Sequence, residues 1–168
     1  MRRKEREITD LEELLAVVSR CKVCRLAMAE NNRPYVVPLN FGYEYQNGEL
    51  SLYFHGAQEG KKIDILKNNP EVCFEMDGGH QLIEGREAHE YSFAYESVIG
   101  FGRIVFVEED EKKAYGLNLL MKHQTGQDRD FVFDGPRLRA TAVYRVTARS
   151  FTGKRRDQKV PLRETSPF

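Results

Sequence analysis

Hydrophobic residues recur along the chain at two spacings, one typical of helices and one typical of strands. Between residues 11 and 18, four aliphatic side chains fall on one helical face. The preceding Thr9-Asp10-Leu11-Glu12 has capping-box spacing, in which side chains bind the free N–H groups of a helix start. This pattern predicts a first helix. Two more helices are expected at residues 60–67 and 110–124, with inward positions Ile63, Leu66, Ala114, Leu117 and Met121.

A spacing of two, in which alternate side chains point to opposite sides of a strand, marks the other segments. Between residues 35 and 45 every odd position is apolar or aromatic. Pro38 lacks a backbone N–H group, which predicts a sheet edge or a local irregularity there. Turn residues flank this run, so the first three strands are expected to form an antiparallel meander. Strands are expected near residues 21–29, 35–45, 50–55, 72–76, 98–107 and 142–151.

Three of the expected strands have distinctive features. In the third, Leu50, Leu52 and Phe54 share the core face, so the alternate positions, which include Tyr53 and His55, point away from the core. Gly78-Gly79 is expected to break the fourth strand. The apolar run at 98–107 predicts a buried strand in which two glycines let another group approach the backbone closely.

Six antiparallel strands with inserted helices predict a mainly β fold, a small barrel whose closure removes the sheet edges. A chain of 168 residues with 40% hydrophobic and 31% charged residues is expected to form one soluble domain over 1–168, with arms or tails at 1–8 and 157–168. The longest aliphatic run, 14–18, is too short to cross a membrane. No secretory signal precedes the first helix, which predicts a cytoplasmic protein.

The net charge is zero, but the charges are unevenly distributed. Residues 84–111 carry eight acids and two bases, a balance of minus six, and residues 137–163 carry nine bases and one acid, a balance of plus eight. The C-terminal quarter is therefore expected to attract anions. Because few aromatic residues accompany these bases, nucleic acid is not an expected partner.

Three cysteines cannot all pair, and Cys21-Lys22-Val23-Cys24 is the only close spacing among them. A zinc site would need further ligands at a second paired spacing, which the chain lacks. In an extended segment, positions three apart point to opposite faces, so these two thiols are expected to diverge. Packing in the core is the expected role of the cysteines, and no metal is expected.

The strand-to-helix junction from His55 to Lys62 is the most informative local feature. Lys61 and Lys62 fall in the first turn of a helix, where the partial positive charge of the helix start disfavours cations. A bound phosphate would reverse that effect, because it would accept bonds from free N–H groups and from both ammonium groups. Solvated surface lysines are the alternative. His55 is either a general acid or a hydrogen-bonded structural residue.

No Ser-His-Asp order, P-loop or dinucleotide-binding glycine pattern is present. The ordered motifs of the chain instead resemble those of the pyridoxamine phosphate oxidase-like flavin proteins, and more narrowly their nitroimidazole-resistance branch. The resemblance runs from about residue 6 to residue 155. The motifs include Val37-Pro38-Leu39-Asn40-Phe41-Gly42-Tyr43, Leu52-Tyr53-Phe54-His55-Gly56-Ala57, Gly60-Lys61-Lys62, Tyr95-Glu96-Ser97-Val98-Ile99-Gly100-Phe101-Gly102 and Thr152-Gly153-Lys154.

The resemblance implies an FMN-binding split β-barrel that forms a homodimer with one FMN per subunit at the subunit interface. Lys61 and Lys62 would hold the phosphate, and Lys154 would serve the other subunit's site. His55 would be the catalytic residue. The remaining cofactor-binding positions that the resemblance implies are Val37, Pro38, Leu39, Asn40, Tyr53, His55, Ser97 and Val98.

The chain contains no tryptophan and lacks the C-terminal signature of true pyridoxamine phosphate oxidases, so vitamin B6 oxidation is not expected. The expected function is that of an FMN-dependent oxidoreductase that passes electrons from a reduced nicotinamide, NADH or NADPH, to a small acceptor such as a nitroaromatic. One alternative is a flavin or haem carrier or sensor without rapid turnover, with His55 as a haem ligand. Another is a dimeric structural module that binds no cofactor.

Overall fold

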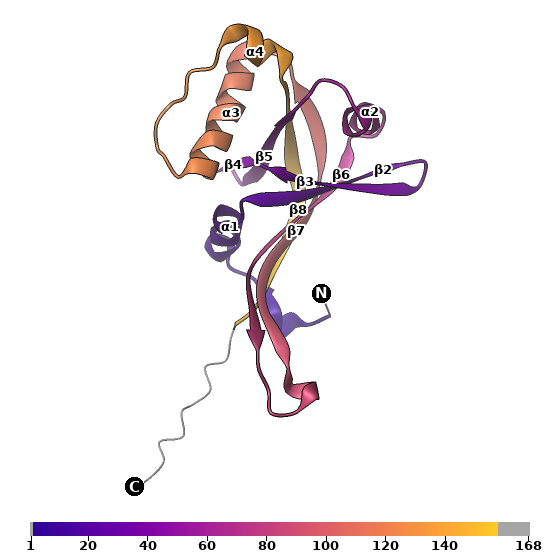
Figure 1. The fold of residues 1–168 in the computed structure, drawn as a ribbon, viewed down its shortest axis with the longest axis vertical. Coiled ribbons are helices and arrows are strands. Elements are labelled where there is room, and N and C mark those ends of the chain that lie inside the picture. The colour runs from indigo at the N-terminus through magenta and orange to yellow at the C-terminus, as the bar shows by residue number, and fades with distance from the viewer. Residues whose placement is uncertain (1, 158–168) are drawn as a thin grey trace.

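The computed structural model describes residues 2–157, so the tail expected at 158–168 lies outside the described residues. Eight antiparallel strands form one sheet with the order β3-β2-β6-β7-β8-β5-β4, and β1 pairs with β8 (Figure 1). The mainly β prediction is confirmed, with eight strands rather than six. The strands are β1 (Glu7–Ile8), β2 (Val23–Glu30), β3 (Arg33–Asn40), β4 (Gly42–Gln46), β5 (Glu49–Gly56), β6 (Glu71–Ile83), β7 (Ser92–Val107) and β8 (Ala142–Arg156).

The three expected helices are present, together with a short one that the pattern did not predict. These are α1 (Leu11–Arg20), α2 (Lys61–Asn68), α3 (Asp110–Thr125) and the additional α4 (Gly135–Ala140). Asp10, rather than Thr9, caps α1, because its carboxylate accepts a 2.9 Å bond from the Glu13 N–H group. Single turns of 3-10 helix lie at η1 (Lys4–Arg6) and η2 (Ala88–Glu90).

The expected meander is wrong, because the run at 35–45 divides into two strands at Phe41. β2 pairs with β3, and β4 pairs with β5, but β3 and β4 lie at opposite ends of the strand order. Phe41, which is fully buried, is the single residue that joins those two ends. The two end strands of the sheet, β3 and β4, are therefore consecutive in the chain but do not pair with each other. The sheet is curved and left open between them, as expected for a split barrel. The prediction that Pro38 lies on an edge strand is confirmed.

Gly78-Gly79 does not end β6, as the sequence had suggested. The register with β7 shifts by one residue between Gly78 and Gln81, and Gly79 takes a positive φ of 65°. This bulge lets the strand continue to Ile83 while it changes direction. Residues 79–95 of β6 and β7, here called the arm, project from the body of the molecule (Figure 1).

The interior is filled by alternate side chains of the strands and by the inner faces of α1 and α2. Its largest fully buried aromatic residues are Tyr144, Phe41, Phe54 and Phe74. The predicted close approach at Gly100 is confirmed, because a Cβ atom there would overlap the Phe74 ring and lie 2.7 Å from the Ser150 carbonyl oxygen. In residues 2–157, no helix is both long and apolar enough to cross a membrane.

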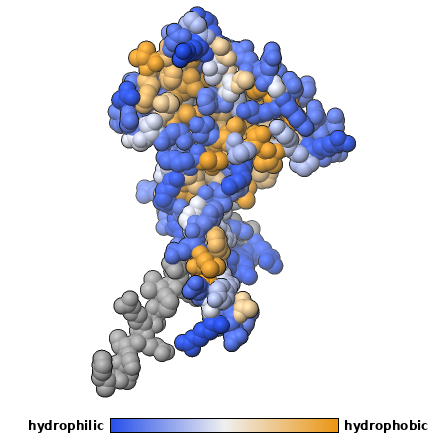
Figure 2. Space-filling model, in the orientation of Figure 1, coloured by the Kyte–Doolittle hydropathy of each residue, from blue (hydrophilic) through white to orange (hydrophobic). Residues whose placement is uncertain are grey.

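The strand at 98–107 is buried on one face only, which corrects the expectation of a fully buried strand. Val98 and Ile104 point into the core, but Ile99, Phe101 and Val105 are 45%, 59% and 51% exposed. The helices of this chain do not cover the outer face at these positions. Figure 2 shows apolar side chains in several surface patches, on the body and on the projecting part of the molecule.

Candidate functional site

The start of α2 has the features of an anion site. β5 ends at Gly56, and Gly60 precedes the helix with a φ of 120° that favours glycine. No side chain caps this helix start. The first N–H groups of a helix have no partner within it, and within residues 2–157 those of Lys61, Lys62 and Ile63 make no other hydrogen bond. Three donors are therefore available to an anion.

Both lysines of the first turn lie over aromatic rings. The Lys61 ammonium is 4.8 Å from the centroid of the Tyr35 ring, and the Lys62 ammonium is 5.5 Å from that of Tyr144. Burial lowers the pKa of Lys62. In the part of the chain that the structure describes, no carboxylate lies within 4.0 Å of either ammonium. The two lysines thus supply positive charge that residues 2–157 do not neutralise.

Two buried polar atoms beside Lys62 lack partners. The Nδ1 atom of His55 and the hydroxyl of Tyr144 make no hydrogen bond in the described structure. Burial, and secondarily the charge of Lys62, lower the pKa of His55, so the imidazole is neutral near pH 7. Buried polar groups are nearly always paired in folded proteins. Both atoms lie near Lys62 but on opposite faces of the β5–β8 pair, because Tyr144 is opposite Phe54 and His55 is opposite Val143 in register. We call Lys61, Lys62, His55 and Tyr144 the α2 cluster, since its cations and unpartnered polar atoms suit a polar ligand.

The expected flavin-bordering segment, 37–40, lies on β3, the strand whose Tyr35 ring centroid is 4.8 Å from the Lys61 ammonium. Val37 and Leu39 turn their side chains to the core, whereas Pro38 and Asn40 are exposed. In an antiparallel hairpin with a two-residue turn, paired residues alternate between hydrogen-bonded and non-hydrogen-bonded positions, starting with a hydrogen-bonded pair next to the turn. By this alternation Pro38 and Asn40 occupy non-hydrogen-bonded positions, so their backbone polar groups point away from β2. Among the described strands, β3 pairs only with β2, so those groups are available to a ligand.

Tyr53 lies on the same face of β5 as His55 but has a different environment. Its ring packs against Gly116 of α3, and its hydroxyl donates a 2.6 Å hydrogen bond to Glu44. The Tyr115 hydroxyl donates to the other oxygen of Glu44 at 2.5 Å. Burial and the Glu44 carboxylate raise the pKa of Tyr53. Tyr53 is thus held by α3 and is not part of the α2 cluster.

Ser97, Val98 and Lys154 lie toward the arm rather than at the α2 cluster. Ser97 faces Lys154 in the register of β7 and β8, while Val98 is fully buried in the core. The end of β7 at Val107 pairs with Val143, which in turn pairs with His55. Val98 therefore lies nine positions along β7 from the His55 row. Within one chain, Ser97, Val98 and Lys154 therefore lie apart from the α2 cluster, as does Tyr53.

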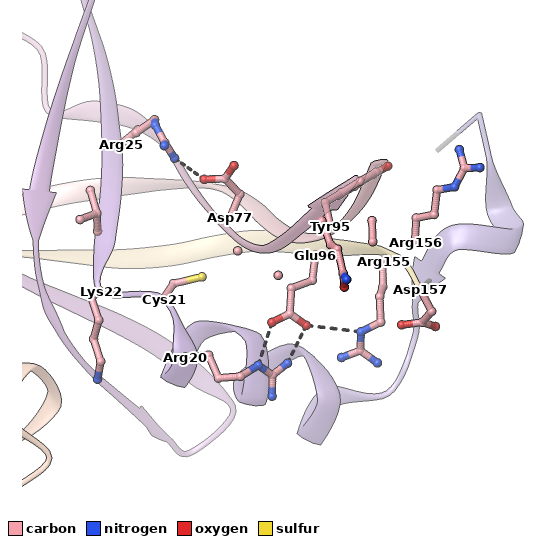
Figure 3. A pocket seen from close by; sticks show the side chains of 15 residues that line it. Arg20, Cys21, Lys22, Arg25, Asp77, Tyr95, Glu96, Arg155, Arg156 and Asp157 are labelled. Carbon is pink, nitrogen blue, oxygen red and sulfur yellow. Dashed lines mark hydrogen bonds and ion pairs between the residues drawn. The ribbon is translucent and has the colours of Figure 1, made fainter. Parts of the chain in front are cut away.

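A cavity of about 530 Å³ lies next to Ser97 and Lys154, at the base of the arm (Figure 3). Glu96 accepts bonds of 2.7 and 2.6 Å from the Arg20 guanidinium, and Arg155 lies 3.4 Å away. Arg20 and then Arg155 hold the pKa of Glu96 below its usual range. Burial, followed by the Glu96 charge, raises the pKa of Cys21 to about 11. This thiol is therefore protonated at neutral pH.

Sequence reasoning missed several of these residues. Glu44, Glu96, Arg20 and Tyr144 gave no local signal, because each finds its partner only through long-range pairing. Cys21 follows α1 instead of lying in a strand, and Cys24 is fully buried in β2. Among the described residues, no group of three or more His, Cys, Asp and Glu side chains is placed to hold a metal.

The described structure is an antiparallel split barrel. It carries a cationic polar cluster, some of whose polar atoms are unpaired, and β3 has one free edge. The sequence profile of the pyridoxamine 5'-phosphate oxidase family matches residues 10–155. The chain belongs to this family, and the expected membership is confirmed. A comparison with curated proteins gives no significant match.

Solved structures support the same classification. A candidate 5-nitroimidazole antibiotic resistance protein from Bacteroides thetaiotaomicron is 32% identical, with a TM-score of 0.77 over 88% of this chain and 85% of that one. The flavocytochrome Anf3 from Azotobacter vinelandii is 21% identical, with a TM-score of 0.76 over 94% and 72%. An FAD and heme binding protein from Mycobacterium smegmatis is 20% identical, with a TM-score of 0.75 over 90% and 74%. The last two show the shared fold.

Proposed function

We propose that the chain binds FMN and that the α2 cluster holds its phosphate. The observation that carries this proposal is the combination of two lysines without carboxylate partners and three free N–H groups at the start of α2. A phosphate dianion offers the acceptors and the negative charge that these groups lack. The unpartnered Nδ1 of His55 and the unpartnered hydroxyl of Tyr144 are further polar atoms near Lys62, one on each face of the β5–β8 pair.

The ring system would lie along β3, where the backbone groups of Pro38 and Asn40 are free to pair with its polar edge. FMN, when bound, supplies hydride and electron transfer from NADH or NADPH to a small acceptor such as a nitroaromatic. The protein holds the phosphate, orients the ring and excludes water from one of its faces. A neutral His55 can orient the acceptor through a hydrogen bond, and it can donate a proton to the acceptor only after it has taken one up from solvent.

The outer face of the sheet supports a homodimer. Val36, Ala27, Cys73 and Phe101 are successive neighbours in register across β3, β2, β6 and β7. We call these four residues the apolar row. Val36 and Phe101 are 53% and 59% exposed. A second copy placed on this face would bury the row and complete the site at the interface, with Lys154 of one protomer serving the cofactor of its partner.

Absorption spectroscopy tests the proposal directly. Protein purified without added cofactor, or reconstituted with FMN, should show the bands of oxidised flavin. Mass spectrometry of the material released on denaturation should then identify FMN. A colourless protein that cannot be reconstituted would overturn the flavin assignment. Consumption of NADH or NADPH with a nitroaromatic acceptor tests turnover separately from binding.

A flavin or haem binding protein without rapid turnover is the second candidate. It is favoured by the buried, unpartnered Nδ1 of His55, since a neutral imidazole nitrogen is a common haem ligand. A Soret band that disappears in His55→Ala would support haem binding. Bound flavin in a protein that consumes no reduced nicotinamide with any acceptor would favour carriage or sensing over catalysis.

A further inference from the structure

Lys113 occupies a position on α3 where an apolar residue would be expected. The buried face of this helix consists of Lys113, Gly116, Leu117 and Leu120. Lys113 is only 6% exposed, whereas the side chain of its neighbour Lys112 is 68% exposed and pairs with Glu109. Charged side chains are rarely so fully buried unless they are paired. The position therefore calls for an explanation beyond packing.

The Lys113 ammonium is poorly satisfied by this chain. Its one hydrogen bond in the described structure is a 3.2 Å contact to the carbonyl oxygen of Thr141. Within residues 2–157, no carboxylate lies within 4.0 Å of it. An ammonium group has three donors. Burying a charge is costly unless the charge is paired and hydrogen-bonded, so a counter-ion from outside the chain would relieve the cost.

A cavity of about 360 Å³ lies beside Lys113, between α2, the loop at Gln58 and the adjoining ends of β7 and β8. Five of its nine lining residues are apolar, and the other four are Lys113, Gln58, Lys67 and Glu108. Gln58 is bonded to the Arg139 carbonyl oxygen. The apolar wall consists of Ile63, Phe106, Val107, Ala142 and Val143.

We propose that this cavity binds a small organic carboxylate. The carboxylate would pair with the Lys113 ammonium, and a short apolar body would lie on the aliphatic and aromatic wall. Lys67 adds a second positive charge at the cavity, which outweighs the single negative charge of Glu108. An apolar body distinguishes this ligand from inorganic phosphate, which would leave the wall uncovered.

The carboxylate site is separate from the α2 cluster. Ile63 and Lys67 come from later positions of α2 than Lys61 and Lys62, and neither His55 nor Tyr144 lines the cavity. The two sites are nevertheless neighbours, because Val143 of the cavity wall pairs with His55 in register. Carboxylate binding at Lys113 would require no particular cofactor at the α2 cluster.

Calorimetric titration of the whole protein with hexanoate, and in parallel with the neutral isostere hexanamide, tests the assignment. Hexanoate should bind at least tenfold more tightly than hexanamide. Lys113→Gln, which keeps a donor for the Thr141 carbonyl but removes the charge, should weaken hexanoate binding at least tenfold. Lys112→Gln, the matched exposed neighbour, should leave binding unchanged.

The outcomes separate this proposal from the flavin proposal. Absence of hexanoate binding, or equal binding of hexanoate and hexanamide to the unmodified protein, would overturn it even if Lys113→Gln did not fold. Competition between hexanoate and FMN at a single site would also overturn it, because hexanoate would then occupy the α2 cluster. The flavin spectrum is recorded independently, so failure of either proposal leaves the other testable.

Discussion

The Lys62 ammonium lies 5.5 Å from the centroid of the Tyr144 ring, although Lys62 begins a helix and Tyr144 belongs to the second half of the chain. Tyr144 is fully buried, and its hydroxyl has no hydrogen-bond partner in the described structure. A cation held over an aromatic face gains about 0.5–2 kcal/mol, depending on how far it is desolvated. This contact fixes the Lys62 stem and leaves its N–H donors available, which suits a residue that binds an exchangeable anion.

Replacing both lysines should therefore weaken FMN binding without unfolding the protein. We expect the double substitution Lys61→Ala/Lys62→Ala to raise the Kd for FMN at least tenfold, because two charge-assisted bonds to the phosphate are lost. Fluorescence titration with FMN measures the affinity, and circular dichroism verifies the fold. Lys112→Ala, which removes an exposed lysine of α3, is the control. An unchanged Kd in the double variant would remove the phosphate assignment.

Any side chain at position 100 should destabilise the fold. A Cβ atom there would overlap the Phe74 ring inside the barrel and press against the Ser150 carbonyl oxygen at 2.7 Å. Gly100→Ala should lower the free energy of unfolding by about 1–3 kcal/mol, as is typical of overpacked cores. Denaturant unfolding measures the loss. Gly78→Ala is the matched control, because its Cβ atom would meet only the Cys21 sulfur at 3.8 Å. Equal stability of the two variants would contradict the close approach.

Local patterns in the sequence predicted the elements but not how their ends connect. Pro38 indicated an edge strand correctly, because a missing N–H group has the same meaning wherever the strand lies. The alternation from 35 to 45 continues across Phe41, although the chain there passes from one end of the sheet to the other. Alternation of apolar residues with a period of two indicates which face of a strand is buried, but it does not indicate which strand is its partner. The expected meander was wrong for this reason.

The site was predictable to the extent that it is local in sequence. His55, Lys61 and Lys62 lie within eight positions, and the charge at a helix start signals an anion. Tyr144 and Glu96 acquire their roles from long-range pairing, and no spacing reveals such pairing. The burial of Lys113 could in principle have been predicted, because this residue falls beside the apolar stripe of its helix. It was not predicted because a lysine in an amphipathic helix usually lies on the solvated face.

Acid should destabilise the protein through its buried histidines. Burial lowers the pKa of His55 and of His123. Each group therefore binds a proton more readily in the unfolded chain, whose histidines titrate near pH 6.5. The free energy of unfolding should be largest above pH 6.5 and should fall as the pH drops from 6.5 toward the folded-state pKa values. Chemical unfolding at several pH values measures this slope.

The same experiment on His55→Asn isolates one of the two groups. Asparagine does not titrate in this range, so the slope below pH 6.5 should become smaller but remain, because His123 is still present. His89→Asn is the control, since this histidine is exposed on the arm and makes no side-chain hydrogen bond or ion pair among the described residues. A slope that is unchanged in His55→Asn would show that His55 is not held neutral by burial.

Glu96 should hold α1 against the base of the arm. Its side chain is 12% exposed, and its carboxylate accepts two bonds from Arg20 and lies 3.4 Å from Arg155. Glu96→Gln should lower the free energy of unfolding by about 1–3 kcal/mol, the usual cost of losing hydrogen bonds to a charged group. A double-mutant cycle with Arg20→Ala measures the coupling between the two side chains. The exposed pair of Lys112 and Glu109, taken through the same cycle, should give a coupling near zero.

Phe101 should determine whether two copies associate. It lies in the apolar row on the outer face of β7 and is 59% exposed in the single chain, so a second copy seated there would bury it. Phe101→Glu would place one carboxylate from each copy at the symmetric contact. Both carboxylates would have to lose their hydrating water on association, which disfavours the dimer. We expect a dimer for the unmodified protein and a monomer for Phe101→Glu in light scattering coupled to size-exclusion chromatography.

Flavin binding should be lost together with the dimer, because the proposed cofactor contacts residues of both protomers. Val132→Glu is the matched control, since Val132 is an apolar residue that is 99% exposed and lies outside the strands of the sheet. That variant should remain a dimer with normal FMN affinity. A monomeric Phe101→Glu protein that still binds FMN with unchanged Kd would show that each chain forms its flavin site alone, and a monomeric unmodified protein would refute the proposed interface.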